Sequence, residues 1–347
     1  MPDSERNQAH SLEATPCAGH ARAGRRAFVV ALAGVAALCA AHARAQAKLH
    51  RIGFLGNSTA ALEANLVGPF REGLRDLGYV EGTNIAIEYR WAEGDYARFP
   101  KLVDELLAAG VDVIVTAGTP ASQAVERANS RVPLVMIAVG DPVGTHLAAS
   151  LAHPGGNATG LTSIAPDLEG KRLELLTQIV PRLASVAVIW NPDNAFHVGA
   201  ERQAQAAAAR LGLDLLSVGV RAASDLDAAF ERISAHNAGA LSVLADRVYL
   251  HNRARIVAFA ARRRLPAVYA YRELVDAGGL MSFGPNYAEM HRRAATYVDR
   301  IFKGAKAGDL PIEQPTKFHL LINLRAANAI GLAIPQALLV RADELIR

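Results

Sequence analysis

Cysteine is scarce in this chain of 347 residues, which has only two, Cys17 and Cys39. Both lie within the first 47 residues, a segment whose composition marks it for removal. The rest of the protein therefore has neither a thiol nor a disulfide, which an oxidising compartment permits when the core is large. This scarcity excludes thiolate metal sites and cysteine nucleophiles from the body of the protein.

The signatures of common enzyme classes are also missing. The sequence has no G-x-S-x-G elbow, no P-loop, no G-x-G-x-x-G fingerprint and no H-E-x-x-H zinc motif. The glycine-rich stretch 155–160 (GGNATG) has Asn157 where a dinucleotide fingerprint requires its second glycine. His146 and His153 are seven residues apart and could share one face of a helix, but Pro154 and the glycine after it would end such a helix, so the pair does not predict a metal site. We therefore expect no enzymatic activity, no metal and no organic cofactor.

Basic and acidic residues are nearly balanced in this sequence. The 37 Lys and Arg against 33 Asp and Glu give a net charge of +4, and loss of the arginine-rich first 47 residues would reduce it further. The densest basic run, 262–264, follows an amphipathic stretch, where cations stabilise the C-terminus of a helix. We therefore expect no nucleic-acid partner.

The first 47 residues are organised like an export signal. A polar leader carrying Arg25 and Arg26 precedes an apolar run over residues 27–41, and small residues then form A-x-A sites that end at Ala45 and Ala47. The apolar run is shorter than the roughly 20 residues that a membrane-spanning helix needs. We therefore predict that residues 1–47 are a cleaved signal and that the protein is periplasmic. The arginine pair favours the twin-arginine route without excluding the general one.

Beyond the signal, short apolar runs alternate with helical stripes of 10–16 residues. Apolar runs separated by amphipathic helices are typical of βαβ crossovers and of parallel sheets that are covered on both faces. The predicted strands cover residues 52–55, 84–89, 111–115, 134–139, 159–163, 186–190, 213–218, 241–244, 267–270, 279–283 and 318–324. The fold class is therefore α/β, with doubly wound parallel sheets.

The strands fall into two blocks, because the turn-forming stretch 153–157 (HPGGN) interrupts the rhythm near the end of the first. We predict a first lobe over residues 48–163 and a second over 164–277. Residues 278–347 are expected to return to the first lobe and to supply a hinge strand and C-terminal helices.

Polar residues follow the carboxyl ends of the predicted strands in both blocks. Open parallel sheets bind ligands just outside these ends. The candidate ligand-binding residues are Asn57, Ser58, Gly118, Thr119, Pro120, Ala121, Asp141, Asn191, Asp246, Tyr271 and Glu273. Each residue alone is equally explained as part of a βα turn.

These candidates suggest complementary roles. Thr119 before Pro120 is a typical N-cap followed by a favoured first helical residue, and the free N–H groups of residues 118–121 suit a carboxylate. The hydroxyls of Ser58 and Thr119 would add hydrogen bonds, and Asp141 would border the pocket or orient a loop. In the second lobe, Asp246 or Glu273 would neutralise an ammonium. The apolar walls would come from the aromatic residues Tyr271, Tyr287 and Trp190. Trp190 and Tyr271 are equally explained as core residues, and Glu273 as a residue that caps or flanks a helix.

Several longer motifs follow one another along the chain after residue 47. They are 70–79 (FREGLRDLGY), 81–82 (EG), 117–121 (AGTPA), 153–160 (HPGGNATG), 279–284 (GLMSFG), 310–318 (LPIEQPTKF) and 322–324 (INL). In sequence and order they resemble the tryptophan/tyrosine-type family of ABC-transporter substrate-binding proteins, which have the type 1 periplasmic-binding fold, and the match spans essentially all of the chain after residue 47. The resemblance implies two lobes, a ligand captured in the cleft between them, and delivery to an ABC permease with its ATPase in the inner membrane.

The sequence thus predicts an exported, monomeric solute-binding protein whose lobes close on a small molecule, with an amino acid as the favoured ligand. Peptides, other small carboxylates and purine-like solutes stay open. The alternatives are a ligand-sensing subunit of a signalling receptor, which differs only in its partner, and an exported α/β hydrolase. A sugar-responsive repressor has a related fold but would begin with a helix-turn-helix domain.

Overall fold

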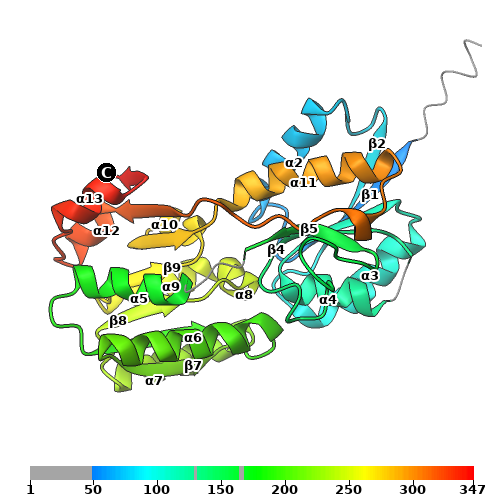
Figure 1. The fold of residues 1–347 in the computed structure, drawn as a ribbon. Coiled ribbons are helices and arrows are strands. Elements are labelled where there is room, and N and C mark those ends of the chain that lie inside the picture. The colour runs from blue at the N-terminus through cyan, green and yellow to red at the C-terminus, as the bar shows by residue number, and fades with distance from the viewer. Residues whose placement is uncertain (1–48, 129–130, 164–167) are drawn as a thin grey trace, which may run out of the picture. The chain divides into compact units, whose positions relative to one another are not determined.

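Two β-sheets organise the part of the chain that the computed structural model describes, which is residues 49–128, 131–163 and 168–347. Residues from His50 to the C-terminus form one unit, and Figure 1 shows its elements. The predicted export signal lies outside the described residues. Within them, no helix combines the length and the apolar content needed to cross a bilayer.

The first sheet has five parallel strands in the order β2-β1-β3-β4-β5. Strands β3, β4 and β5 are buried along their whole length, as the continuous apolar sequence of β4 (LVMIAV) predicts for that strand. The strands are β1 (His50–Gly56), β2 (Ile85–Trp91), β3 (Val113–Ala117), β4 (Leu134–Val139) and β5 (Ala158–Thr162).

Four helices cover this sheet and complete the first lobe. Helices α2 (Ala64–Asp76) and α11 (Tyr287–Phe302) lie side by side on one face, whereas α3 (Phe99–Ala108) and α4 (Thr119–Arg127) cover the other (Figure 1). In α2, Leu66, Phe70 and Leu74 recur every four residues and are buried against the sheet.

A close approach between α2 and α11 depends on a glycine. A Cβ atom at Gly73 would lie 2.5 Å from the carbonyl oxygen of Arg292 and 2.9 Å from the Cβ of Ala295. Only a residue without a side chain permits this spacing. Arg292 also pairs with Glu72 and Asp76 on α2, but these side chains are exposed, so the ion pairs add little stability.

The second sheet has seven strands in the order β12-β11-β10-β9-β8-β6-β7, all parallel to their neighbours except β10 and β11. Helices on both faces complete the second lobe. The strands are β6 (Ser185–Trp190), β7 (Asp214–Gly219), β8 (Ala240–Val243), β9 (Ala267–Tyr269), β10 (Met281–Gly284), β11 (His319–Asn323) and β12 (Glu344–Ile346). The helices are α5 (Leu168–Ile179), α6 (Ala195–Leu211), α7 (Leu226–Ala235), α8 (Arg247–His251), α9 (Arg253–Arg262), α10 (Arg272–Asp276), α12 (Leu324–Ala329) and α13 (Gln336–Arg341). Short 3-10 turns occupy Tyr96–Arg98, Ala223–Asp225 and Ala307–Asp309.

The predicted α/β class with two parallel-sheet lobes is confirmed, and each apolar run predicted as a strand forms one. The prediction for residues 278–347 is wrong in one respect. Strands β10, β11 and β12 extend the second sheet instead of returning to the first lobe. The short helix α10 joins β9 to β10, and such a connection places consecutive parallel strands side by side.

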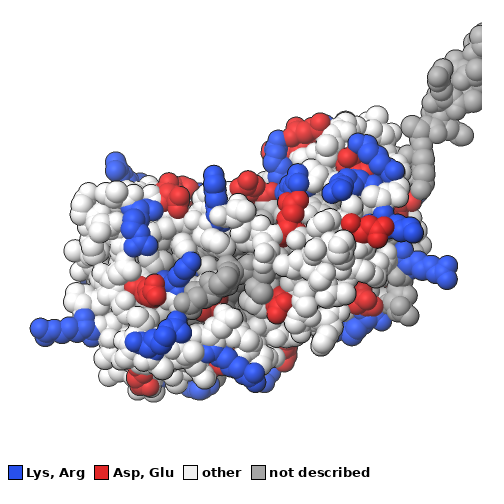
Figure 2. Space-filling model, viewed as in Figure 1, with Lys and Arg blue, Asp and Glu red and all other residues white. Residues whose placement is uncertain are grey.

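The chain passes between the lobes three times. It crosses between Ser163 and Leu168, again from the end of β10 to the start of α11, and finally between Glu313 and His319. The segment before the last crossing packs on the first lobe, where the Thr159 hydroxyl donates a hydrogen bond to the carbonyl of Leu310 (2.7 Å). Acidic and basic side chains are interspersed on the face in Figure 2, in keeping with the small net charge.

Candidate ligand-binding site

The loops that follow the strands of both sheets converge on a pocket between the lobes. It contains about 320 Å³ of space, part of which is open to solvent. The first lobe contributes Tyr96, the start of α4, and the ends of β4 and β5. The second lobe contributes residues after β6, β8 and β9, and α11 adds its first residue, Tyr287. Of the candidates from the sequence, this pocket is lined by Gly118, Thr119, Pro120, Asp246 and Tyr271.

Asn57 and Ser58 shape the loop after β1. The Asn57 amide donates to the carbonyl of Ala117 (3.0 Å), and the backbone N–H groups of both residues donate to one carboxylate oxygen of Glu63 (2.9 and 2.6 Å). Burial raises the pKa of Glu63, although the positive charge of Arg247 and these two hydrogen bonds oppose the rise. The Ser58 hydroxyl lies 2.7 Å from Nδ1 of His251 in the second lobe, so it joins the lobes outside the pocket.

Thr119 does not have the predicted capping role. Helix α4 begins at Thr119 itself, and Gly118, with a φ of 82°, occupies the N-cap position. A positive φ favours glycine there. The Thr119 hydroxyl instead accepts a hydrogen bond from the N–H of Gly140 (3.1 Å). The first-turn N–H groups of α4 have no partner within the helix, and Pro120 has none to offer, so Thr119 and Ala121 are the donors available here.

Asp141 orients its own loop. One carboxylate oxygen accepts a hydrogen bond from the N–H of Gly144 (2.8 Å), and the backbone carbonyl of Asp141 accepts one from the N–H of Thr145 (2.9 Å). Asp141 is not among the residues that line the pocket. Of the two roles considered for Asp141, the geometry therefore favours the structural one.

Asp246 is a buried hub whose acceptor positions are mostly occupied. It accepts hydrogen bonds from the Tyr96 hydroxyl of the first lobe (2.7 Å) and from the N–H of Val248 (3.0 Å), where it caps α8. The amides of Asn194 (2.9 Å) and Asn191 (3.3 Å) also donate to it. Asn191 thus supports Asp246 instead of facing the pocket.

Glu273 retains one unused acceptor. One of its oxygens accepts a hydrogen bond from the Asn65 amide of the first lobe (2.7 Å), whereas the other, Oε2, is buried without a partner among the described residues. Glu273 lines an adjoining pocket that shares Tyr287 with the central one. Of the two carboxylates considered for an ammonium, Glu273 has the freer oxygen.

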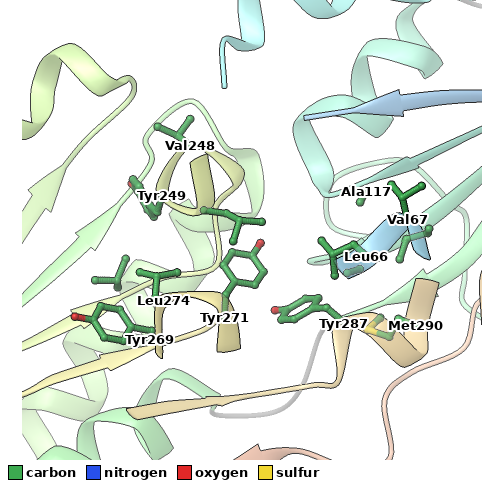
Figure 3. Close-up of a cluster of buried hydrophobic side chains, with 14 of the residues drawn as sticks. Leu66, Val67, Ala117, Val248, Tyr249, Tyr269, Tyr271, Leu274, Tyr287 and Met290 are labelled. Atoms are coloured by element: carbon green, nitrogen blue, oxygen red, sulfur yellow. The ribbon is translucent and has the colours of Figure 1, made fainter. Parts of the chain in front are cut away.

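Two of the three predicted aromatic walls reach the pocket. The rings of Tyr271 and Tyr287 lie next to each other, with centroids 4.6 Å apart (Figure 3). Trp190 lies elsewhere, because its indole N–H donates to the Ser217 hydroxyl on the neighbouring strand (2.8 Å) and its ring packs in the second lobe. Phe196, which the sequence did not single out, lines the pocket instead.

The most informative residue of the pocket, Arg247, was missed by the sequence interpretation. Its side chain is 2% exposed, and none of its three guanidinium nitrogens has a hydrogen-bond partner among the described residues. The guanidinium carbon lies 5.1 Å from the Tyr271 ring centroid and 5.7 Å from that of Tyr287, within range of cation–π attraction. The signal was present, since Arg247 directly follows Asp246 after an apolar strand.

The guanidinium of Arg247 stays protonated although it is buried. Burial alone would lower the pKa of the guanidinium, but the two tyrosines and the carboxylates of Glu63 and Glu273 together raise it. Neither carboxylate forms an ion pair with Arg247 within 4 Å in the described part of the chain. The pocket therefore contains a buried cation with unused donors, an arrangement that suits an anionic group of a ligand.

The lobes are in contact around the pocket. Besides the bonds already described from Ser58, Tyr96 and Asn65, Phe196 packs so closely on the first lobe that a Cβ atom at Gly140 would lie 2.0 Å from its Cγ. This arrangement is the closed form of a two-lobed cleft. Among the described residues, no group of three or more His, Asp or Glu is placed to hold a metal ion.

Comparison with known proteins shows which family this chain is similar to. Residues 58–346 match the family model described as ABC transporter substrate binding protein. A curated relative, the tyrosine-binding protein of Clostridioides difficile, is 25% identical over 284 residues, which are 79% of this chain and 80% of the relative.

Solved structures share the fold. A conserved domain protein from Vibrio cholerae is 29% identical and has a TM-score of 0.80, with 86% of this chain and 100% of that chain covered. An ABC domain from Streptococcus pneumonia, solved in complex with L-Trp, is 23% identical, with a TM-score of 0.80 and the same coverage of 86% and 100%. The two-lobed architecture is the type 1 periplasmic-binding fold that the sequence resemblance implied.

The family match spans most of the chain. It includes every strand of both sheets except β1, which ends before the match begins at residue 58. Proteins of this family bind substrates and are not enzymes, which agrees with the prediction from the missing catalytic motifs. The chain therefore belongs to the family of ABC transporter substrate binding proteins.

Proposed function

We propose that this protein is exported to the periplasm, binds a free amino acid between its lobes, and delivers it to the permease and ATPase of an ABC uptake transporter. The observation that carries the amino-acid assignment is the unpaired guanidinium of Arg247 in the closed pocket. The family supports transport, and the N-terminal sequence supports export.

The carboxylate of the ligand binds Arg247. A buried charge without a partner costs about 3–5 kcal/mol relative to a paired one. A carboxylate removes this cost with two parallel N–H···O bonds to the planar guanidinium. The start of α4 is close enough to contribute, since a Cβ atom at Gly118 would lie 3.8 Å from Cγ of Arg247. Its first-turn N–H groups and the helix dipole favour the same anion.

The rest of the ligand contacts aromatic rings and an acid. Tyr96, Phe196, Tyr271 and Tyr287 line the pocket, and such rings suit a large, flat side chain. The names of two relatives, one binding tyrosine and one solved with L-Trp, support an aromatic amino acid. Glu273, with its unpartnered oxygen, is the carboxylate for the ammonium.

Arg247 also makes closure depend on the ligand. With the lobes apart, water hydrates the guanidinium. With them together, its nitrogens lose that water and find no protein partner among the described residues. Closure of the empty protein is therefore penalised, and the ligand supplies the differential affinity that favours the closed form. A permease can then distinguish loaded from empty protein by shape.

The test is a thermal-shift screen of the purified protein with the common amino acids, followed by calorimetry. A ligand at 100 times its dissociation constant should stabilise the protein by about 2.7 kcal/mol. The primary amide of the best ligand, which lacks the carboxylate, should bind at least tenfold more weakly than the acid. Equal affinities for acid and amide would contradict the role of Arg247.

Two variants sharpen this test. Arg247→Met keeps the length of the side chain but removes the donors, and should weaken binding of the acid about 100-fold while affecting the amide much less. Arg221→Met is the matched control in the same lobe, because Arg221 is 57% exposed and pairs with Asp193 on the surface. If Arg221→Met weakens binding as much as Arg247→Met does, the effect is not specific to the pocket.

A further inference from the structure

A second compartment adjoins the central pocket, and Arg247 is not part of its lining. It contains about 400 Å³ of space, part of which is open to solvent, and shares Ser163, Phe196, Ala245 and Tyr287 with the central pocket. Tyr287 lies between the two: burial raises its pKa to about 12, and the charges of both Arg172 and Arg247 oppose the rise. The two spaces are therefore continuous, with Arg247 lining only the central pocket and Arg172 only the second compartment.

A buried ion pair, Glu169 with Arg172, lines this second compartment. Glu169 lies in the first turn of α5, where the helix dipole stabilises a carboxylate, and Arg172 follows one turn later on the same face. The side chains are 6% and 1% exposed, and Nη1 of Arg172 lies 2.5 Å from Oε1 of Glu169. Nε of Arg172 donates to the carbonyl of Phe283 (2.9 Å).

Each member of this pair keeps one unused group. Oε2 of Glu169 and Nη2 of Arg172 are buried without a hydrogen-bond partner among the described residues. A buried polar atom without a partner costs about 1–3 kcal/mol. One acceptor and one donor on adjacent side chains match a ligand group that both donates and accepts. Because the charges of the pair compensate each other, a neutral polar group suits this compartment better than a charged one.

We propose that Glu169 and Arg172 bind the distal polar group of the ligand, so that the preferred solute is an aromatic amino acid with a hydrogen-bonding ring. This proposal rests on the proposed function, in which Arg247 takes the carboxylate. A phenol hydroxyl donates to Glu169 and accepts from Arg172. An indole N–H satisfies Glu169 alone, and a phenyl ring satisfies neither. The affinity order is therefore L-tyrosine, then L-tryptophan, then L-phenylalanine.

The experiment is calorimetric titration of the purified protein with these three amino acids. L-tyrosine, which differs from L-phenylalanine only in its hydroxyl, should bind at least tenfold more tightly, because the phenyl ring leaves both buried groups unsatisfied. In Glu169→Gln the ratio of the two affinities should fall to within about twofold to threefold. Arg247→Met is the contrasting variant, since it should weaken all three ligands by a similar factor and preserve their ratio.

Glu169→Gln leaves the Arg172 charge buried and uncompensated, so the variant is at risk of not folding. The double variant Glu169→Met/Arg172→Met avoids this risk, because replacing a buried ion pair with apolar side chains of similar volume is often tolerated. It should bind L-phenylalanine at least as tightly as L-tyrosine.

The outcomes separate this inference from the proposed function. Similar affinities of the unmodified protein for L-tyrosine and L-phenylalanine would overturn the role of the pair and leave amino-acid binding intact. So would an unchanged ratio in the double variant, or tight binding of an aliphatic amino acid only. Failure of every amino acid to bind would overturn both.

Discussion

Gly140→Ala should keep the lobes from closing. A Cβ atom at position 140 would lie 2.0 Å from Cγ and 2.4 Å from both Cδ atoms of Phe196. These atoms form the near edge of the ring, which is anchored to the N-terminal turn of α6 and has little freedom to retreat. The clash exists only when the two lobes are together, because residues 140 and 196 belong to different lobes.

The expected magnitude follows from the cost of overpacking. An extra carbon in a well-packed contact costs about 1–3 kcal/mol. If that cost is paid only in the closed, ligand-bound form, it appears in the dissociation constant, where each 1.4 kcal/mol is a factor of ten. Gly140→Ala should therefore weaken binding of L-tyrosine by about 5- to 150-fold. The melting temperature of the ligand-free protein should change little.

Calorimetry on four proteins tests this reasoning: the unmodified chain, Gly140→Ala, Phe196→Ala and the double variant. Phe196→Ala removes the ring, so the added methyl group should then cost almost nothing, and the coupling energy of the cycle should approach the full cost of Gly140→Ala. Small-angle scattering at an L-tyrosine concentration close to the dissociation constant of the unmodified protein should show that the ligand compacts the unmodified protein more than Gly140→Ala. Unchanged affinity in Gly140→Ala, or additive effects in the double variant, would refute the argument.

Three further predictions concern stability and processing. Gly73→Ala should lower the free energy of unfolding by about 1–3 kcal/mol in urea denaturation, because its Cβ atom would lie 2.5 Å from the carbonyl oxygen of Arg292; an unchanged midpoint would show that α2 and α11 can separate freely. Burial lowers the pKa of His291 from 6.5 to about 3, so the unfolded chain binds the proton first as the pH falls, and His291 should reduce stability progressively between pH 6.5 and about 3. Replacement by Gln should flatten this part of the pH profile of the free energy of unfolding, and an unaltered profile would contradict the assignment. N-terminal sequencing of periplasmic protein should begin at Gln46 or Lys48, and a cytoplasmic chain that retains Met1 would exclude export.

The strands could be predicted because a strand that is buried on both faces needs apolar residues at successive positions. Runs such as 134–139 (LVMIAV) are apolar throughout, and β4 is buried along its whole length. Strand β12 escaped prediction, since it has three residues and begins with an exposed glutamate. The second-lobe position of β10 and β11 also escaped, because an apolar strand does not specify which of two sheet edges it joins.

The candidate site was harder to predict because its decisive property arises only when the lobes meet. The position of the pocket followed from the carboxyl ends of the strands. The position of Arg247 after an apolar strand marked it as a loop residue near the pocket, but its burial and its unpaired state depend on side chains from both lobes, which the sequence does not bring together. The same limit applies to Asp246, whose hydrogen bond to Tyr96 spans 150 residues.

Helix α11 ties the completion of the first lobe to the end of synthesis. The sheet of that lobe is finished at Thr162, but the helix that packs beside α2 begins at Tyr287. Until then, the side of α2 that packs against α11 is uncovered, and Ala294, Ala295 and Val298 cannot make their contacts in the hydrophobic core. A nascent chain therefore cannot complete its first lobe before most of the second lobe has been synthesised, unlike a protein whose domains are contiguous in sequence. It emerges from the ribosome almost entire before either lobe has a complete core, which extends the time during which chaperones can bind it.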